Sequence, residues 1–259
     1  MNWSRAKTIL IIALLVTDVF LILTYGNFGL AKPGEFKDYK ALAEFLSQKG
    51  IYVDAGLIPR QSKDMPVLDV QHEEVDPMAV EGLLFFSQRL WATGSDSEGE
   101  YRRIAELFIK ELLDEDPAIR DIKKNAVFES LERDGDCVRV IYKNAVNGTT
   151  IDKSHVTFVF KDKEMSGVDC QWLSAVNFHS KKQKTISAAQ ALMAFMTQAL
   201  EGELGAVDGG IQVSSIEMVY WLDESSIDVG TAVLADTAFP AWKIVYDGNE
   251  AAYIDAYGQ

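Results

Sequence analysis

The sequence predicts an α+β protein in which an N-terminal transmembrane helix precedes two units, each a helix packed on an antiparallel sheet. Three observations support this prediction: an apolar stretch over residues 8–25, amphipathic helix patterns near residues 100 and 190, and about four β-rich runs after each pattern. The expected organisation is a cytoplasmic N-terminus (1–7), a transmembrane helix (8–25), an extracytoplasmic domain (26–180) and a C-terminal domain (181–259).

The apolar stretch over residues 8–25 decides the expected compartment. It carries one charge, Asp18, and as a helix it would cover ~27 Å, close to the ~30 Å hydrocarbon core of a bilayer. Arg5 and Lys7 precede it, so the positive-inside rule places the N-terminus in the cytoplasm and the later residues outside. A cleaved signal peptide is the rival interpretation, because Gly29-Leu30-Ala31 offers small residues for cleavage, and a buried core helix is the third.

Asp18 has the most specific implication within this stretch. It would lie near the bilayer midplane, where an ionised carboxylate costs about 2.5–3.5 kcal/mol. A partner group on another transmembrane helix would offset this cost. We therefore expect the helix face that carries Asp18 to pack on such a helix, the alternative being a protonated and tolerated Asp18.

The charge of the chain argues against several classes of partner. The formal net charge is −14, and the first 25 residues contribute +1 through Arg5, Lys7 and Asp18, so the remainder carries −15. A domain this acidic repels phosphate backbones and anionic lipid surfaces, which makes nucleic-acid binding a poor hypothesis. Hydrophobic residues make up 48% of the chain, enough to build a core.

The first unit is predicted from helix and strand patterns. Helices are expected over 36–49, ended by Gly50, and over 100–113, where Ser97 and Glu100 have the spacing of a capping box. A strand is expected at 67–70. Four further strands are expected at 126–132, 137–143, 155–161 and 167–178. A turn at Asp134-Gly135 would join the first two, and a turn at Asn147-Gly148 would join the second and third.

The two cysteines are expected to stay separate thiols. In a meander of these strands, Cys170 would lie opposite Val159, and Val159 opposite Val140. Cys137 and Cys170 would then be two strands apart, about 10 Å across the sheet. A disulfide tolerates a Cα separation of up to about 7 Å.

The second unit repeats the order of the first. A helix is expected over 186–204, followed by strands at 212–222, 231–234, 241–246 and 251–256, with a hairpin turn at Asp247-Gly248-Asn249. The aromatic residues of these strands have two interpretations, packing against the 186–204 helix, which we favour, or lining a ligand groove. They are Trp221, Trp242, Tyr246 and Tyr253.

The chain carries no motif of a common enzyme class. His72, His155 and His179 fall in different segments and lack metal-ligand spacing to one another or to cysteine. A P-loop, a dinucleotide fingerprint and a Gly-x-Ser-x-Gly elbow are all absent from the sequence. We therefore expect a non-enzymatic protein without catalytic residues, cofactor or metal.

Both ends of the chain resemble the YycI (WalI) family. Asn2-Trp3-Ser4, Lys7-Thr8-Ile9 and Asp18-x-Phe20-Leu21 resemble the opening of that family, and residues 241–248 and 252–256 resemble its ending and related PepSY-like modules. The resemblance implies a YycH/YycI-like fold. It also implies a regulator of WalK, the sensor histidine kinase of the essential two-component system WalK/WalR (YycFG), which controls cell-wall metabolism in Gram-positive bacteria.

The same resemblance implies a complex of this chain with the kinase and a YycH-like companion, formed largely through transmembrane helices. The residues of this chain that fall on the family's N-terminal motif are the expected contacts: Trp3, Ser4, Lys7, Thr8, Asp18 and Phe20. The alternative is an exported PepSY-like binding or inhibitory module for a protease or cell-wall hydrolase, acting from the sheet that carries Trp242. An exported hydrolase, the third hypothesis, would need a pocket joining His155 or His179 to a carboxylate and a nucleophile.

Overall fold

The computed structural model describes residues 38–73, 97–112, 117–202, 210–222 and 235–258. Within these ranges no helix is both long and apolar enough to cross a bilayer. The expected transmembrane helix at 8–25 lies outside the described residues, as does the expected strand at 231–234. The same is true of every expected contact residue of the anchor: Trp3, Ser4, Lys7, Thr8, Asp18 and Phe20.

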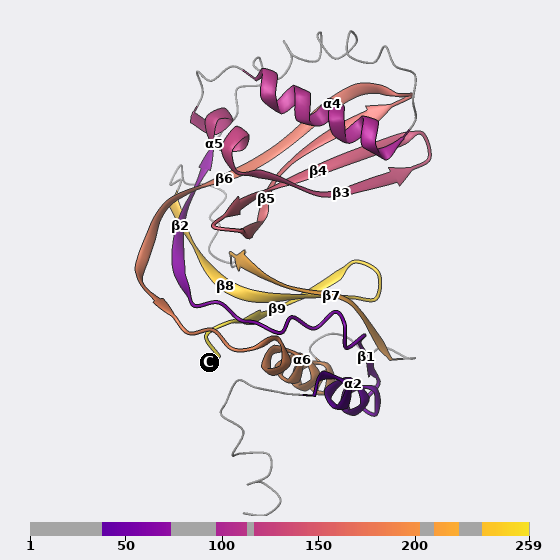
Figure 1. Cartoon of the computed structure of the whole chain (residues 1–259), viewed down its shortest axis with the longest axis vertical. Helices are drawn as coiled ribbons and strands as arrows, with labels where there is room; N and C mark the ends of the chain where they lie inside the picture. Colours follow the sequence, from indigo (N-terminus) through magenta and orange to yellow (C-terminus); the bar gives the residue numbers. More distant parts are fainter. Residues whose placement is uncertain (1–37, 74–96, 113–116, 203–209, 223–234, 259) are drawn as a thin grey trace, which may run out of the picture.

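The described chain forms a mixed α+β fold of two lobes that face each other like the arms of a C (Figure 1). In the first lobe two helices cover one face of a four-stranded antiparallel sheet. Its elements are α4 (Glu98–Glu111), α5 (Pro117–Asn125), β3 (Ala126–Asp134), β4 (Cys137–Val146), β5 (Thr149–Lys161) and β6 (Glu164–Gln183).

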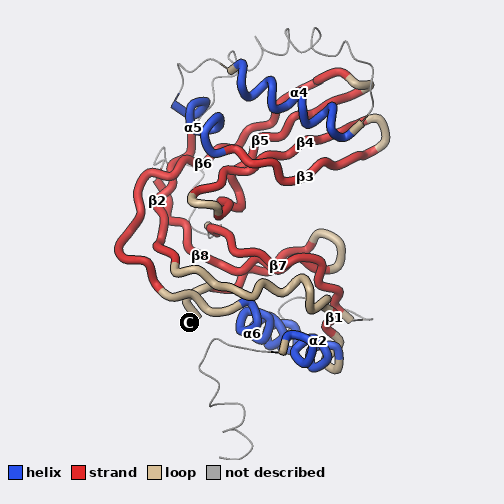
Figure 2. The backbone as a smooth tube through the Cα atoms, in the orientation of Figure 1, coloured by secondary structure: helices blue, strands red, loops and turns tan. Residues whose placement is uncertain are grey.

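The second lobe has two helices packed below a second group of strands (Figure 2). Its helices, α2 and α6, come from opposite ends of the described chain and contact each other. Its elements are α2 (Tyr39–Ser47), β1 (Ile51–Tyr52), α6 (Ala188–Glu201), β7 (Ile211–Trp221), β8 (Ala235–Tyr246) and β9 (Glu250–Asp255), and β2 (Met65–Glu73) joins the lobes.

Two connections join the lobes. At the back of the C, β2 pairs antiparallel with β6 on one side and with β8 on the other. On the inner side, Thr150 and Ile151 of β5 pair in parallel with Val219 and Tyr220 of β7. This two-residue pairing closes β7, β8, β2, β6 and β5 into a ring, so the lobes share one continuous strand network.

Three apolar clusters follow from this topology. One lies under each pair of helices: Phe195 of α6 meets Tyr246 of β8 in the second lobe, and Phe108 of α4 meets Phe158 of β5 in the first. The third fills the ring between the lobes. Its buried members are Met65, Leu68, Val70, Ile151, Leu173, Tyr220, Leu222 and Ala238.

The helix ends show where local sequence rules hold. Asp38 caps α2 by accepting hydrogen bonds from the backbone N–H groups of Lys40 and Ala41. Ser187 and Gln190 form a complete capping box on α6. Ser97 is the N-cap residue of α4 as expected, but its side chain makes no capping hydrogen bond, and the Glu100 carboxylate pairs with Arg103 at 2.7 Å instead.

The described strands confirm the predicted β-meander and correct its register. β3 to β6 pair in sequence order, with turns at the predicted Asp134-Gly135 and Asn147-Gly148 positions. Cys170 lies opposite Val156, not Val159, because β6 begins at Glu164 after a tight turn and a bulge follows Val159. The two cysteines are separate thiols, as predicted.

The sequence patterns did not predict helix α5. The division into domains at residues 180 and 181 stays a prediction. Residues 117–125 form α5, which begins at Pro117 and lies between the expected helix at 100–113 and the expected strand at 126–132. The first unit therefore has two helices before its four strands. β6 continues across residues 180 and 181, the predicted boundary, and α2 and β1 pack with the second lobe.

Candidate functional site

The most connected polar group on the inner side of the C is Asp152, at the start of β5. Its neighbour Ile151 points into the core of the ring and pairs with β7. Because successive side chains of a strand point to opposite faces, Asp152 points out of the ring, toward the space between the lobes. Its side chain is 8% exposed.

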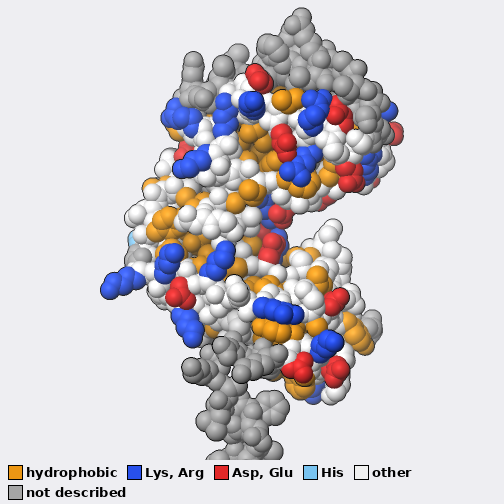
Figure 3. Space-filling model, in the orientation of Figure 1, with side chains coloured by type: hydrophobic (Ala, Val, Ile, Leu, Met, Phe, Trp, Pro, Cys, Tyr) orange, Lys and Arg blue, Asp and Glu red, His pale blue; other side chains and the backbone are white. Residues whose placement is uncertain are grey.

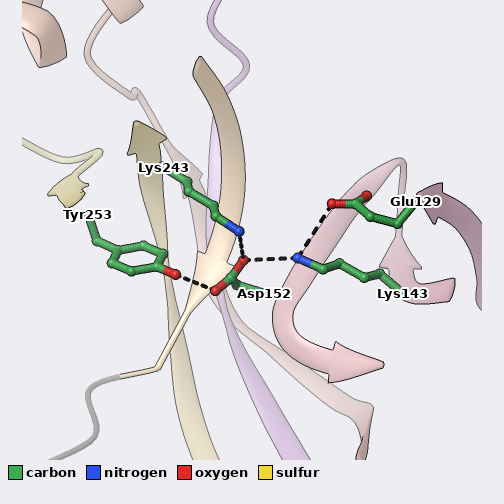
Figure 4. Close-up of polar contacts among 5 residues, drawn as sticks. All are labelled: Glu129, Lys143, Asp152, Lys243 and Tyr253. Carbon is green, nitrogen blue, oxygen red and sulfur yellow. Dashed lines mark hydrogen bonds and ion pairs between the residues drawn. The ribbon is translucent and has the colours of Figure 1, made fainter. Parts of the chain in front are cut away.

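Asp152 binds side chains from both lobes (Figure 4). Oδ1 accepts hydrogen bonds from Lys143 Nζ of β4 at 3.1 Å and from Lys243 Nζ of β8 at 2.6 Å. Oδ2 accepts one from the Tyr253 hydroxyl of β9 at 2.5 Å. One carboxylate therefore ties β4 of the first lobe to two strands of the second.

Two further carboxylates lie beside this group, one from each lobe. Glu129 of β3 pairs with Lys143 at 3.6 Å, and Glu217 of β7 lies opposite Lys243 in the strand register. We call these six residues the lobe junction: Glu129, Lys143, Asp152, Glu217, Lys243 and Tyr253. With three carboxylates and two lysines, the lobe junction carries a net charge of −1 when all five are ionised.

The environment shifts the ionisation of several of these groups. Burial opposes the charged form of Asp152, but Lys143, Lys243 and Tyr253 outweigh it and hold the pKa of this carboxyl below its usual value. Burial would lower the pKa of Lys143, yet Asp152 and Glu129 raise it above the usual value. Burial and the nearby Glu129 carboxylate raise the pKa of Glu217. Asp152 is thus fixed in its charged form, and Glu217 takes up a proton more readily than a free glutamate.

An aromatic pair adjoins the lobe junction. The rings of Trp221 and Tyr253 stack with their centroids 5.7 Å apart and an interplanar angle of 22°. Phe239, which pairs with Trp221 in the register of β7 and β8, is 43% exposed. Figure 3 shows a hollow between the lobes with acidic and basic side chains on its inner wall.

The four aromatic residues singled out from sequence have different roles. Trp242 and Tyr246 belong to the core packed on α6, which confirms the favoured interpretation for these two. Tyr253 belongs to the lobe junction and lies opposite Lys243 in the register of β8 and β9, and Trp221 of β7 stacks on it. Sequence analysis did not find Asp152, whose partners Lys243 and Tyr253 are 91 and 101 residues away.

A small pocket lies at the same meeting of the lobes. It has a volume of about 200 Å³, with the β4–β5 turn of the first lobe on one side and strands of the second lobe on the other. Met218 and Trp242 supply apolar surface, and the segment before β2 and the β4–β5 turn supply the remaining lining residues. The lining residues are Pro59, Gln61, Ser62, Lys63, Gly148, Thr149, Met218 and Trp242.

The histidines lie apart from this site. His155 of β5 is 3.5 Å from Asp169, and His179 of β6 is 2.7 Å from Asp69, each in a separate pair. His72 lies on β2 opposite Leu173. Across the described residues, no group of three or more His, Cys, Asp or Glu side chains is placed to hold a metal ion.

Comparisons with known proteins identify no family for this chain. No protein-family model matches it, and no curated protein matches it. Among solved structures, the C-terminal domain of Bacillus megaterium YpeB matches with 10% sequence identity and a TM-score of 0.33. The match covers 76% of this chain and 65% of that one, so this chain spans just under two thirds of the matched domain. Values this low do not support a statement about shared function.

Proposed function

We propose that this chain is a single-pass membrane protein whose extracytoplasmic domain regulates a sensor histidine kinase, without enzymatic activity of its own. The observation that carries the proposal is the apolar stretch over residues 8–25, with Arg5 and Lys7 before it and Asp18 at its middle. The resemblance of the two chain ends to the YycI family supports a WalK-like kinase of cell-wall metabolism and a YycH-like companion as partners.

The proposed mechanism is a helix–helix contact in the bilayer whose strength depends on the state of the external domain. Asp18 would supply a polar contact to the partner helix, together with Trp3, Ser4, Lys7, Thr8 and Phe20. A coupling of about 1–3 kcal/mol is enough to change an output several-fold. The lobe junction supports this mechanism, since it is a polar contact between two lobes, and switching transitions often repack ion pairs at such an interface.

Replacing Asp18 with Leu tests the proposal, because the change removes the carboxylate and leaves an apolar helix. We expect less kinase to co-purify with the full chain from membranes, and a several-fold change in the output of the kinase's target genes. The matched control is the double variant Asp18→Leu/Val16→Asp, which returns one carboxylate to the opposite side of the helix. It should not restore the contact. Unchanged co-purification and unchanged output in Asp18→Leu would refute the proposed transmembrane contact.

A second candidate function is an exported PepSY-like binding or inhibitory module for a protease or cell-wall hydrolase. The stacked pair Trp221 and Tyr253 favours this candidate, because Tyr253 also bonds to Asp152, and aromatic faces beside charged groups suit ligand binding. Exchange of residues 8–25 for an unrelated transmembrane helix distinguishes the two. Function should survive the exchange under the second candidate and fail under the first.

A further inference from the structure

Four exposed lysines gather at one end of β6 and beside it, in a domain that is otherwise strongly acidic. Lys181, Lys182 and Lys184 follow one another at the end of β6 and just after it, and all three are exposed. Lys63 is exposed on the neighbouring segment before β2. We call these four residues the basic ridge.

Hydrogen bonding places the two segments of the basic ridge side by side. Met65 of β2 lies opposite Gln183 of β6. The Thr185 hydroxyl donates to the Lys63 carbonyl oxygen at 2.9 Å, and Thr185 is buried. The backbone on both sides is therefore held in place, and the four lysines occupy neighbouring positions of two paired segments.

The basic ridge has a local excess of positive charge. Among the described residues, no ion pair includes any of its four lysines. Asp64 is the exposed acidic residue within its two segments, so the net local charge is +3. Residues 26–259 together carry −15, which makes this surface the opposite of its surroundings. Two exposed apolar side chains, Val176 (58%) and Phe178 (39%), precede it on β6.

The basic ridge belongs to the lobe into which the proposed anchor leads. Tyr39, the first residue of α2, and Ile186, two residues after Lys184, pack on the same core. Between Tyr25 at the end of the anchor and Asp38 at the start of the described chain there are thirteen residue steps, which span at most about 45 Å. The second lobe is therefore tethered close to the bilayer if residues 8–25 cross it.

We propose that the basic ridge is the surface through which the domain rests on the anionic lipid headgroups of the bilayer that holds its anchor. This inference depends on the anchor of the proposed function. The headgroups attract the basic ridge and repel the rest of the acidic domain, so the two effects together orient the domain. Each lysine near an anionic surface strengthens attachment about fivefold, an effect that falls off within a Debye length of ~10 Å at 0.1 M salt.

The test measures how fast an amine-reactive reagent labels each lysine of the full chain in lipid nanodiscs. One set of nanodiscs contains neutral phosphatidylcholine, and the other contains phosphatidylcholine with about a third phosphatidylglycerol. At low salt we expect several-fold slower labelling of the basic ridge in the anionic nanodiscs, and recovery in 1 M salt. Lys161 and Lys163, exposed at the far β5–β6 turn, provide the internal reference and should label equally in both.

A charge-reversal variant ties the protection to the basic ridge. In Lys181→Glu/Lys182→Glu/Lys184→Glu, the retained Lys63 should lose its protection by anionic lipid. The matched control, Lys110→Glu/Lys161→Glu/Lys163→Glu, changes the net charge equally at exposed positions of the first lobe. In it Lys63 should stay protected relative to Lys124, an exposed lysine of α5 that serves as the reference in both variants. The three reversals should weaken lipid attachment on the order of a hundredfold or more, from about fivefold per lysine.

The outcomes separate this inference from the proposed anchor. If the chain inserts into both kinds of nanodisc and the basic ridge labels at the same rate in each, the lipid contact is refuted and the anchor stands. Equal loss of protection in both triple variants would also refute it, because net charge rather than this surface would be responsible. If the chain does not insert, the anchor fails and the lipid contact fails with it.

Discussion

Replacing Asp152 with Asn tests whether the lobe junction holds the two lobes together. The substitution keeps the shape of the side chain and its bond from the Tyr253 hydroxyl, and it removes the charge that binds Lys143 and Lys243. Lys143 keeps Glu129 at 3.6 Å, whereas Lys243 loses its 2.6 Å partner in a half-buried position. Removal of one partner from a buried ion pair costs about 3–5 kcal/mol, and an exposed pair is worth at most about 1 kcal/mol.

The lobe junction lies between these limits. The Asp152 side chain is 8% exposed, while Lys143 and Lys243 are 11% and 15% exposed. We therefore expect Asp152→Asn to lower the free energy of unfolding by about 2–4 kcal/mol. The control is Asp169→Asn, whose side chain is 75% exposed and 3.5 Å from His155; this change should cost less than about 0.5 kcal/mol.

The measurement is urea unfolding of the full chain in detergent micelles, followed by tryptophan fluorescence and by circular dichroism. The matched variants report on Asp152 itself, because both remove one carboxylate charge from the same sheet. If Asp152→Asn falls within about 0.5 kcal/mol of the unmodified chain, the lobe junction contributes little and the reasoning is wrong. Separate transitions by the two probes would show that the lobes unfold independently once the carboxylate is lost.

Three further predictions follow from other sites. The folded-state pKa of Glu217 is raised, so ionisation of this group destabilises the fold, and its contribution to stability falls as pH rises from about 4.5 through the raised value. Glu217→Gln should abolish that fall and should be more stable than the unmodified chain near pH 7. Urea titrations at several pH values measure both effects. Asp121→Ala removes the acceptor of the Trp172 indole N–H at 2.8 Å and of Asn144 at 3.2 Å, and should cost about 2–3 kcal/mol by thermal or chemical unfolding. Gly202→Ala should lower the free energy of unfolding by about 1–2 kcal/mol in the same measurement, because this residue ends α6 with a φ of 81°. No neighbour obstructs an added Cβ, so the cost comes from the backbone conformation alone.

Asp152 has the opposite pH dependence to Glu217, so the two can be told apart. Its folded-state pKa is lowered, so its contribution is present above the ordinary carboxyl value of about 3.9 and is lost as pH falls through the lowered value. As pH falls, the gain in stability from Glu217 is complete at about pH 4.5, whereas the loss from Asp152 begins only below about pH 3.9. The difference between Glu217→Gln and Asp152→Asn in a pH series therefore assigns each effect to its residue.

Local patterns predicted most of the secondary structure. The alternation in β4, where Val138, Val140 and Tyr142 are buried, defines a strand with one face on a core. The spacing of Leu192, Phe195 and Met196 defines the buried face of α6 in the same way. Such patterns report which face of an element is buried, and this information is contained in a few consecutive residues.

The missed helix α5 shows where local rules conflicted. The acidic run at 114–116 and Pro117 after it are typical of the solvated end of a helix. Pro117 instead begins a new helix, a position that suits a residue without a backbone N–H. The spacing of Ile119 and Ile122, both buried, was the available signal.

The lobe junction could not be predicted, because its geometry depends on pairings between distant strands. β2 pairs with β6 and β8, about a hundred residues or more further along the chain, and β5 meets β7 in a two-residue parallel pair. A one-residue change in any of these registers would turn Asp152, Lys243 or Tyr253 to the other face of its strand. In sequence, Asp152 is one acidic residue among 39.

Under the proposed function, the free energy that the lobe junction contributes to the contact between the lobes makes it suited to regulation. The pairings of β2 with β6 and β8 extend along the back of the C and keep the lobes together, whereas the inner pairing of β5 with β7 covers two residues on each strand. The change of about 2–4 kcal/mol expected for Asp152→Asn is comparable to the 1–3 kcal/mol of a typical allosteric coupling. The apolar clusters under the helices are close-packed and resist gradual deformation. If the proposed function holds, a signal that reaches the domain can act on the inner polar contact and alter the relation of the lobes without unfolding either one.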